Sequence, residues 1–454
     1  MKHLTRHFSF FALLLMAFVA PVQAASSQRA VLLISIDGLH PSYVLEAKKY
    51  GVKAPVLREF VAKGAYATRA INVTPTVTYP NHTALVTGAA PREHGIHTNT
   101  VFDPEGAEKG AWNWYGEQIK VPTLWDAAKA KGMTTAAVLW PVSVGHTAID
   151  YNMPEYWRVK RPSDDYLLNA VSTPRGFLES LDLGPVFGGS PHEGGPTFDA
   201  KLTRIAIAMI ERAQSQLLTV HLVGLDSAQH AHGPLPTNAQ SREMLEQIDA
   251  LVGQLIAAER KAYPSAVIAI ASDHGFLPVN ATVNLNAAFA RAGLIELDTD
   301  GKLKSWKAYS WNSGGSSSIV LKDSNDRRTL EAVDGILTRL AADPKSGIAA
   351  VLRGDAALEE GALPQASFLV DCNAGFAMGD ALTGEIIQPR AKVSGTHGYR
   401  NTHPEMSSSF FVMGPDVAAG RNLGVIDIRQ VAPTLAKELD VALPSAKMAP
   451  LSLR

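Results

Sequence analysis

The sequence predicts an α/β fold in which a mostly parallel central sheet carries helices on both faces, with a smaller α+β subdomain inserted into it. Two observations predict this fold. Short, continuously apolar segments alternate with longer segments of helical periodicity, as in βαβ units. Of the 454 residues, 46% are hydrophobic and 19% are charged, which supports a large core and argues against disorder.

The first half of the chain supplies most of the predicted sheet. Residues 29–36 are apolar without alternation, as expected for a strand buried on both faces. Gly64 and Gly132 each follow a helical segment, and glycine in that position is typical of the C-terminus of a helix. The predicted strands are residues 29–36, 65–73, 133–139, 217–223 and 266–271, and the predicted helices are residues 55–63, 123–130, 203–214 and 241–262.

The pattern changes after about residue 298. Up to residue 380 the sequence predicts a strand at 319–321, a helix at 327–342 and shorter strands near residues 349 and 368. A strand at 408–413 and a helix near 429–438 then return to the earlier pattern. We therefore expect a main domain formed by residues 25–297 and 381–454, with residues 298–380 inserted as the smaller subdomain.

Residues 1–24 have the layout of a secretory signal, in which Lys2 and Arg6 precede an apolar run and small residues follow up to Ala24. The apolar run is too short to span a bilayer comfortably, and an N-terminal membrane anchor is the alternative interpretation. We expect cleavage near Ala24 and a periplasmic or secreted protein. Since no later stretch is long and apolar enough to span a membrane, no stable membrane partner is expected.

The charge and the cysteine content exclude several functional classes. The formal net charge is −1, so the chain lacks the basic surface with which proteins bind nucleic-acid polymers. The single cysteine, Cys372, excludes an intramolecular disulfide and a thiolate metal cluster. Export without disulfides fits a bacterial periplasm better than a eukaryotic extracellular space. The oligomeric state is not predicted.

Four segments place aspartate or histidine at or just after the end of a predicted buried strand, where ligand sites form in open α/β sheets. Each segment alone is compatible with a turn or a helix cap. Together they supply three aspartates and three histidines, enough for two zinc ions with three protein ligands each and an open position for a reacting oxygen. The six residues are Asp37, Asp226, His230, Asp273, His274 and His397.

His232 is an alternative to His230 as the metal ligand in this segment. His230 follows Asp226 by four positions, so that one helical turn would place both side chains on one face. His232 is less suitable by this spacing and could instead support the loop.

A fifth segment, residues 74–88, follows a predicted strand and opens a short helix, whose N-terminus favours an anion. A hydroxyl group attacks poorly unless a base or a metal ion activates it. Four threonines could supply that hydroxyl, and spacing does not choose among them: Thr74, Thr76, Thr78 and Thr83.

Five segments in this order resemble the nucleotide pyrophosphatase/phosphodiesterase family of the alkaline phosphatase superfamily. They read Ile-Asp-Gly at 36–38, Thr-Tyr-Pro-Asn-His at 78–82, Asp-Ser-Ala-Gln-His at 226–230, Ser-Asp-His-Gly at 272–275 and Gly-Thr-His-Gly-Tyr at 395–399. The resemblance implies an alkaline phosphatase-like fold and two zinc ions. One ion would be bound by Asp226, His230 and His397, and the other by Asp37, Asp273, His274 and Thr78.

The resemblance also assigns roles around the reacting bond. It implies that Thr78 is the nucleophile, that a covalent phosphothreonine forms by in-line attack, and that water then hydrolyses it. Asn99 would donate to a non-bridging phosphoryl oxygen, and Tyr79 would line the substrate pocket; the alternatives are a turn residue and a core residue. The implied substrate is a small molecule with a phosphodiester or pyrophosphate bond, most simply a nucleotide.

Other functions on the same scaffold stay open. Phosphomonoesterases of the superfamily hold the extra phosphate charge with an added cation, and here Arg92 is the nearest basic residue after Thr78, while Lys160 and Arg161 could reach in. A choline phosphodiesterase would share these metal ligands. Residues 140–143 read Trp-Pro-Val-Ser where the family has Trp-Pro-Gly-Ser, which leaves the leaving-group preference open.

Two further alternatives fit less well. Cys372 lacks the Cys-x-Pro-x-Arg setting of a sulfatase. A zinc-binding or adhesion protein without catalysis would not need to keep Thr78 beside the six ligands.

Overall fold

The computed structural model describes residues 29–108, 110–158, 163–187, 196–235 and 238–454. The predicted signal segment with its cleavage near Ala24, and both Lys160 and Arg161, lie outside these residues. Within the described part of the chain, no helix combines the length and the apolar character needed to cross a membrane.

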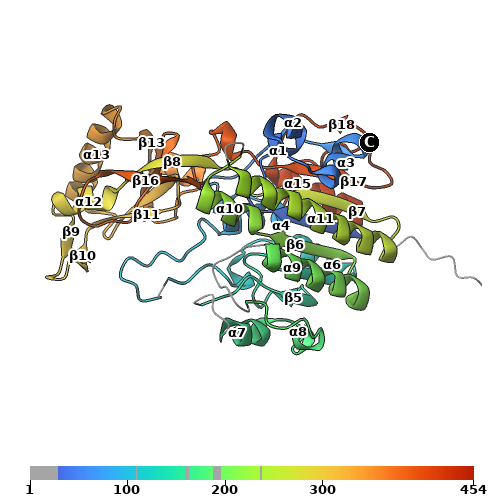
Figure 1. The fold of residues 1–454 in the computed structure, drawn as a ribbon. Helices are drawn as coiled ribbons and strands as arrows, with labels where there is room; N and C mark the ends of the chain where they lie inside the picture. The colour runs from blue at the N-terminus through green and yellow to red at the C-terminus, as the bar shows by residue number, and fades with distance from the viewer. Residues whose placement is uncertain (1–28, 109, 159–162, 188–195, 236–237) are drawn as a thin grey trace, which may run out of the picture.

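A central sheet of eight strands forms the main body (Figure 1). β1 lies in its middle and pairs in parallel with β6 and with β7, and β6 continues in parallel to β4. The exception is β17, which is antiparallel to both β7 and β2. The sheet is therefore mostly parallel, as predicted. The order is β18 (Arg421–Asn422), β2 (Ala65–Tyr66), β17 (Phe410–Met413), β7 (Val267–Ala271), β1 (Val31–Ile36), β6 (Leu217–Leu222), β4 (Thr135–Val138) and β5 (Tyr151–Met153).

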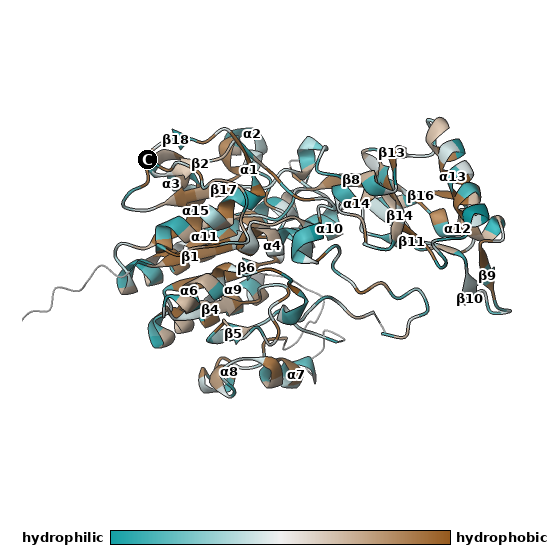
Figure 2. Cartoon of the chain, turned by 180° about the vertical axis from the view of Figure 1, so that it is seen from behind, coloured by the Kyte–Doolittle hydropathy of each residue, from teal (hydrophilic) through white to brown (hydrophobic). Residues whose placement is uncertain are grey.

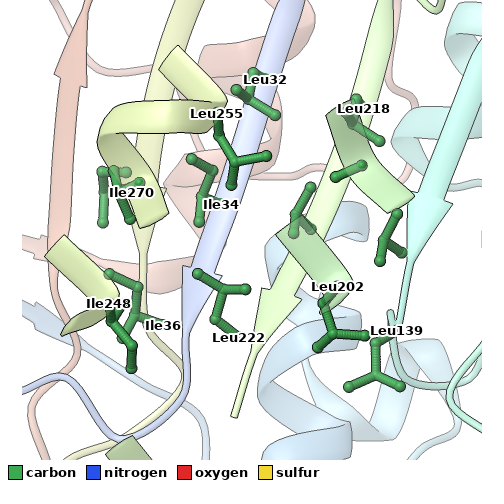
Figure 3. Packing of buried hydrophobic residues seen from close by; sticks show 14 of the residues in the cluster. Leu32, Ile34, Ile36, Leu139, Leu202, Leu218, Leu222, Ile248, Leu255 and Ile270 are labelled. Atoms are coloured by element: carbon green, nitrogen blue, oxygen red, sulfur yellow. The ribbon is translucent and has the colours of Figure 1, made fainter. Parts of the chain in front are cut away.

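The helices cover both faces of the sheet, because alternate side chains of each buried strand point to opposite faces. Leu32, Ile34 and Ile36 of β1 pack with α3 (Pro55–Lys63), α9 (Pro196–Ala208) and α11 (Ala239–Ala262), as Figure 3 shows for Leu255. Val31 and Leu33 pack on the other face with α4 (Thr78–Thr87), α6 (Leu124–Ala130) and α15 (Val431–Leu439). This two-sided burial explains the unbroken apolar run of β1. In Figure 2 the central strands β1 and β17 are mostly brown, whereas teal residues lie on the helices that surround the sheet.

Two predicted elements differ from the observed ones. The strand predicted at 65–73 divides into β2 and β3 (Arg69–Ile71), since Ala67 bonds to β17 and β3 pairs instead with β19 (Val425–Asp427). The helix predicted at 203–214 begins earlier, as α9, and ends in a π-helical turn at Met209–Ala213. Shorter helices complete the main body: α1 (Ser42–Leu45), α2 (Ala47–Tyr50), α5 (Pro91–His94), α7 (Ser163–Val171), α8 (Phe177–Ser180) and α10 (Gly224–His232).

A second body with its own core lies to one side of the central sheet (Figure 1). Its four-stranded antiparallel sheet has the order β11 (Ala308–Asn312), β12 (Ser316–Leu321), β14 (Ala366–Cys372) and β13 (Ile348–Arg353). Its other elements are α12 (Leu285–Arg291), β9 (Ile295–Leu297), β10 (Leu303–Trp306), α13 (Arg327–Ala342) and α14 (Asp355–Glu360).

Three strands connect the second body to the main one: β8 (Leu277–Val283), β15 (Gly375–Met378) and β16 (Ile387–Thr396). The core of the second body includes Leu277 and Leu285 at one end of the sequence, and Tyr399 and Met406 at the other. This core therefore reaches beyond the range 298–380 that the sequence predicts for the inserted subdomain. The extension matters for function, because β16 leads directly to His397.

Candidate metal centre and nucleophile

The predicted ligands meet at one edge of the central sheet. Asp37 follows β1, Asp226 lies in the first turn of α10 after β6, and Asp273 follows β7. Since β1, β6 and β7 are parallel, their carboxyl ends lie at the same edge, and the Asp37 N–H donates to Leu222 O at 2.9 Å across it. The fourth segment returns from the second body along β16.

Asp226, His230 and His397 form the first half-site. Their ligand atoms lie within 4.8 Å of one another. Nε2 of His230 lies 3.4 Å, and Nε2 of His397 3.7 Å, from Asp226 Oδ1. The Nδ1 atoms face the backbone carbonyls of Gly395 and Thr76 at 3.1 and 3.0 Å, so each ring donates there and leaves Nε2 as a lone pair for a metal ion.

Asp37, Asp273 and His274 form the second half-site. Nε2 of His274 lies 3.1 Å from Asp273 Oδ2 and 3.4 Å from Asp37 Oδ1. The ligand atoms of Asp37, Asp226 and His274 also lie within 4.8 Å of one another, so the two half-sites adjoin. The structure thus brings together all six of the predicted ligands.

Buried polar atoms without hydrogen-bond partners show that the donor set fits a metal ion. Asp37 Oδ1, Asp226 Oδ1, Asp273 Oδ2 and His274 Nε2 have no hydrogen-bond partner within the described residues. A buried polar atom left unpaired costs about 1–3 kcal/mol. These atoms face one another, and oxygen with imidazole nitrogen is a donor set that suits zinc.

The electrostatics of the two half-sites favour a cation in the same place. Burial raises the pKa of Asp37 well above its usual range, and the neighbouring Asp226 carboxylate raises it further. Burial and then the Asp37 carboxylate raise the pKa of Asp273 in the same way. Burial lowers the pKa of His274 and lowers that of His397 to about 4, with neighbouring histidines adding to both shifts. The His274 and His397 imidazoles are therefore neutral at pH 7, and a bound cation relieves the repulsion between the carboxylates.

Thr78 is the first residue of α4, and its hydroxyl is the one left free among the four candidate threonines. Thr76 Oγ1 donates to Tyr399 O, Thr83 Oγ1 donates to Tyr79 O, and Thr74 Oγ1 donates to Glu360. Thr78 Oγ1 makes no hydrogen bond within the described part of the chain. The structure thereby gives a physical reason to choose Thr78, which spacing in the sequence did not.

Residues near Thr78 contact ligands of both half-sites. His82, one turn further along α4, has Nδ1 2.9 Å from Thr78 O and 3.6 Å from Asp273 Oδ2 of the second half-site. The His397 ring of the first half-site bonds to Thr76 O. The N-terminus of α4 therefore lies beside both sets of ligands.

Asn99 and Tyr79 flank this helix start. The Tyr79 N–H donates to Asn99 Oδ1 at 2.8 Å, which leaves the Asn99 amide NH₂ available to another acceptor. The Tyr79 ring is fully buried and packs against Trp112, with ring centroids 5.3 Å apart. Trp112 thus covers Tyr79 in this structure, and contact between Tyr79 and a substrate stays a prediction.

Three other residues that the sequence singles out lie elsewhere or have an unexpected backbone conformation. His232 and Arg92 are exposed, and His232 is in neither group of potential ligands. Val142, which stands where the family motif has glycine, has a φ of 55°, a left-handed conformation that glycine adopts more easily.

Sequence reasoning missed two buried residues that hold the ligands in place. His221, in β6, has Nε2 2.9 Å from Asp37 Oδ2 and Nδ1 3.1 Å from Leu139 O. Gln229 of α10 donates to Gly38 O at 2.9 Å. The one available signal was a lone histidine within the largely apolar strand at 217–222.

Known proteins share sequence with this chain over most of its length. The sequence pattern of the family described as type I phosphodiesterase/nucleotide pyrophosphatase matches residues 31–400. Human ectonucleotide pyrophosphatase/phosphodiesterase family member 1 is 26% identical over 254 residues, which is 54% of this chain and 23% of that protein. A cattle protein named bis(5'-adenosyl)-triphosphatase is 24% identical over 264 residues, or 56% of this chain and 48% of the relative. The chain thus matches about half or less of the length of these curated relatives.

Solved structures share the fold across nearly the whole chain. Human ectonucleotide pyrophosphatase/phosphodiesterase 5 superimposes with a TM-score of 0.64 at 20% identity, covering 93% of this chain and 97% of the other. An inactive variant of the murine protein, in complex with AMP, gives a TM-score of 0.65 at 18% identity with the same coverage.

Proposed function

The chain belongs to the type I phosphodiesterase/nucleotide pyrophosphatase family, and from that membership we propose that it hydrolyses phosphodiester or pyrophosphate bonds with Thr78 as nucleophile. One observation carries the proposal. A free threonine hydroxyl lies at a helix N-terminus beside two adjoining sets of aspartate and histidine ligands. Neither a structural zinc protein nor an adhesion protein needs that hydroxyl.

We propose two zinc ions as the cofactors. Asp226, His230 and His397 would hold one, and Asp37, Asp273 and His274, together with Thr78, would hold the other. When bound, the two ions would supply the Lewis acidity that ionises a hydroxyl at neutral pH and that stabilises a departing oxygen.

The residues of the chain would then act in a two-step displacement. Thr78 Oγ attacks phosphorus in line, the bond from phosphorus to the leaving oxygen breaks, and a phosphothreonine results. Water then cleaves the bond between phosphorus and Thr78 Oγ. The Thr78 N–H at the start of α4 and the Asn99 amide NH₂ would stabilise the negative charge on the non-bridging oxygens.

The proposed substrate is a small nucleotide-type diester or pyrophosphate, with Tyr79 lining its pocket. The AMP complex of the murine relative and the name of the cattle relative support this substrate class. A phosphomonoesterase and a choline phosphodiesterase are the alternatives. We also propose a periplasmic or secreted location, which rests on the signal layout of residues 1–24.

Substitution of Thr78 tests the proposal directly. Thr78→Ala should bind both zinc ions but lose at least about 10³-fold in turnover of an aryl phosphodiester, because it removes the attacking group. Thr83→Ala is the matched control, since it removes a hydroxyl from the same helix that already bonds to Tyr79 O. Zinc would be counted by elemental analysis.

Substantial turnover by Thr78→Ala would contradict the assignment of the nucleophile. Turnover that persists after exhaustive zinc removal would contradict the metal-dependent scheme. Rates on an aryl monoester, an aryl diester, a nucleoside triphosphate and a choline phosphodiester decide among the substrate classes, and we expect the diester and the nucleotide to be preferred.

A further inference from the structure

Gln229 lies on α10 between two ligands of the first half-site, yet its own side chain is fully buried. Its Nε2 donates to Gly38 O at 2.9 Å. Gly38 directly follows Asp37, and the Gly38 N–H donates to Asp273 Oδ1 at 3.2 Å. One amide thus connects the helix that carries Asp226 and His230 to the turn that holds the second half-site.

The turn at Gly38 is shaped to receive this bond. Gly38 has a φ of 72°, and a Cβ built there would lie 2.8 Å from Gln229 Nε2. Only glycine combines that left-handed conformation with so close an approach. The close contact with Gln229 therefore requires glycine in the turn after β1.

Tyr43 of α1 fixes the orientation of the amide. Its hydroxyl donates to Gln229 Oε1 at 3.1 Å, and both side chains are buried. Burial raises the pKa of Tyr43, so the hydroxyl keeps its proton and stays a donor. Because Oε1 accepts from Tyr43, Nε2 is the atom that faces Gly38.

The backbone of Gln229 meets the third ligand-bearing segment. A Cβ built on Gly395 would lie 2.4 Å from Gln229 O, so the two backbones touch. Gly395 O in turn accepts from His230 Nδ1, and His397 follows two residues later. Gln229 of α10 therefore contacts the two other segments that carry ligands nearby: the turn after β1, which carries Asp37, and the end of β16, which leads to His397.

We propose that Gln229, oriented by Tyr43, is a positioning residue that sets the separation between the two half-sites. This inference rests on the proposed function, in which both metal ions act on the same phosphoryl group. Catalytic metal pairs lie about 3.5–4 Å apart, so a small shift of α10 against the β1 turn would spoil the pair. A glutamine that only filled space in the core would leave metal binding unchanged once the fold was kept.

Zinc titration tests the positioning role apart from catalysis. Gln229→Met removes both hydrogen bonds at nearly constant volume, and Tyr43→Phe removes only the orienting hydroxyl. In calorimetric titrations of zinc-depleted enzyme, we expect Gln229→Met to bind one of its two zinc equivalents at least about tenfold more weakly. Tyr43→Phe should shift the same equivalent by less. At saturating zinc, kcat on an aryl diester should fall with KM little changed.

Asn286→Leu is the matched control. Asn286 is a fully buried amide of α12 whose two hydrogen bonds, at 2.8 and 3.0 Å, go to Ser310 in the second body. This variant should melt at a lower temperature yet bind both zinc ions as the unmodified protein does.

Wild-type zinc affinity at both equivalents in Gln229→Met overturns the positioning role. If that variant does not fold, Tyr43→Phe decides the matter, because it changes a single oxygen atom, and unchanged zinc affinity in it overturns the proposal. If the unmodified protein binds two zinc ions but cleaves no phosphoric ester, the proposed function fails while the positioning role stands on the titration alone.

Discussion

The two half-sites are built in opposite ways. In the second half-site Asp37 is 3% exposed, while Asp273 and His274 are completely buried, and all three follow central strands. In the first half-site the side chain of His230 is 42% exposed, whereas those of Asp226 and His397 are 18% and 10% exposed, and the ligands come from α10 and from the end of β16. One set of ligands is thus part of the sheet core, whereas the other comes from a helix and a connecting strand and includes one side chain that is open to solvent.

This difference predicts different behaviour toward metal and solvent. The buried set is preorganised by the packing of β1 and β7. Because its carboxylates are buried, water does not hydrate them once a cation is removed. We expect the first half-site, whose His230 is open to solvent, to lose and regain an ion with less rearrangement. We therefore expect the second half-site to set the basic activity and the first to set its sensitivity to zinc concentration.

The largest expected effect comes from removing one ligand in each half-site. Asp273→Asn should lose at least about 10³-fold in diester turnover, and excess zinc should not restore it, because the lost charge is buried. His230→Ala should lose less, and high zinc should restore part of the activity, because water can take the exposed position. Turnover measured across a zinc titration checks both variants. Equal losses with equal recovery would remove the distinction between the half-sites.

A smaller effect is expected behind the buried half-site. His221 fixes Oδ2 of Asp37 and so leaves Oδ1 to face His274. His221→Leu should weaken zinc binding at the second half-site about 10- to 100-fold, the usual cost of losing a partner that orients a ligand.

His221→Gln should recover part of that loss, since its amide can still donate to Asp37. Calorimetric titration would detect both changes, with circular dichroism as the check on folding. A loss confined to the first half-site would show that the two sets are not held independently.

The same contrast separates what the sequence could predict from what it could not. Asp37 and Asp273 were predictable because a carboxylate at the end of an apolar strand has a local signature. His221 and Gln229 have no such signature, because their role depends on contacts with residues 184 and 191 positions away. Thr78 needed the resemblance to a family, and its physical reason, a hydroxyl with no competing bond, became visible only in the structure.

The boundaries of elements and bodies were the least predictable part of the fold. The apolar run at 65–73 looks like one strand, but its pairing changes from β17 to β19 partway along. The second core draws on residues before 298 and after 380, since β8 and β16 pair with each other across that interval. Such pairings follow from tertiary contacts, which a local pattern does not contain.

A buried acid far from the metal ligands provides the last and smallest test. Glu259 of α11 is fully buried, and neither carboxylate oxygen has a hydrogen-bond partner among the described residues. Burial raises the pKa of Glu259 from 4.5 to about 7. It resembles Asp37 and Asp273 in burial, but within the described part of the chain it belongs to no group of potential metal ligands. Its titration therefore measures burial alone.

The sign of the effect follows from the direction of the shift. Between pH 4.5 and about 7 the unfolded chain releases the Glu259 proton while the folded protein retains it, so stability falls as pH rises through this window and then levels off. Glu259→Gln removes that dependence. Its free energy of unfolding relative to the unmodified protein should rise by about 3 kcal/mol between pH 4.5 and pH 8, with turnover unchanged. Chemical unfolding of both zinc-free proteins at several pH values would measure the difference. A constant difference across this range would mean that burial does not raise the pKa of Glu259, and would count against burial as the main cause of the raised pKa values of Asp37 and Asp273.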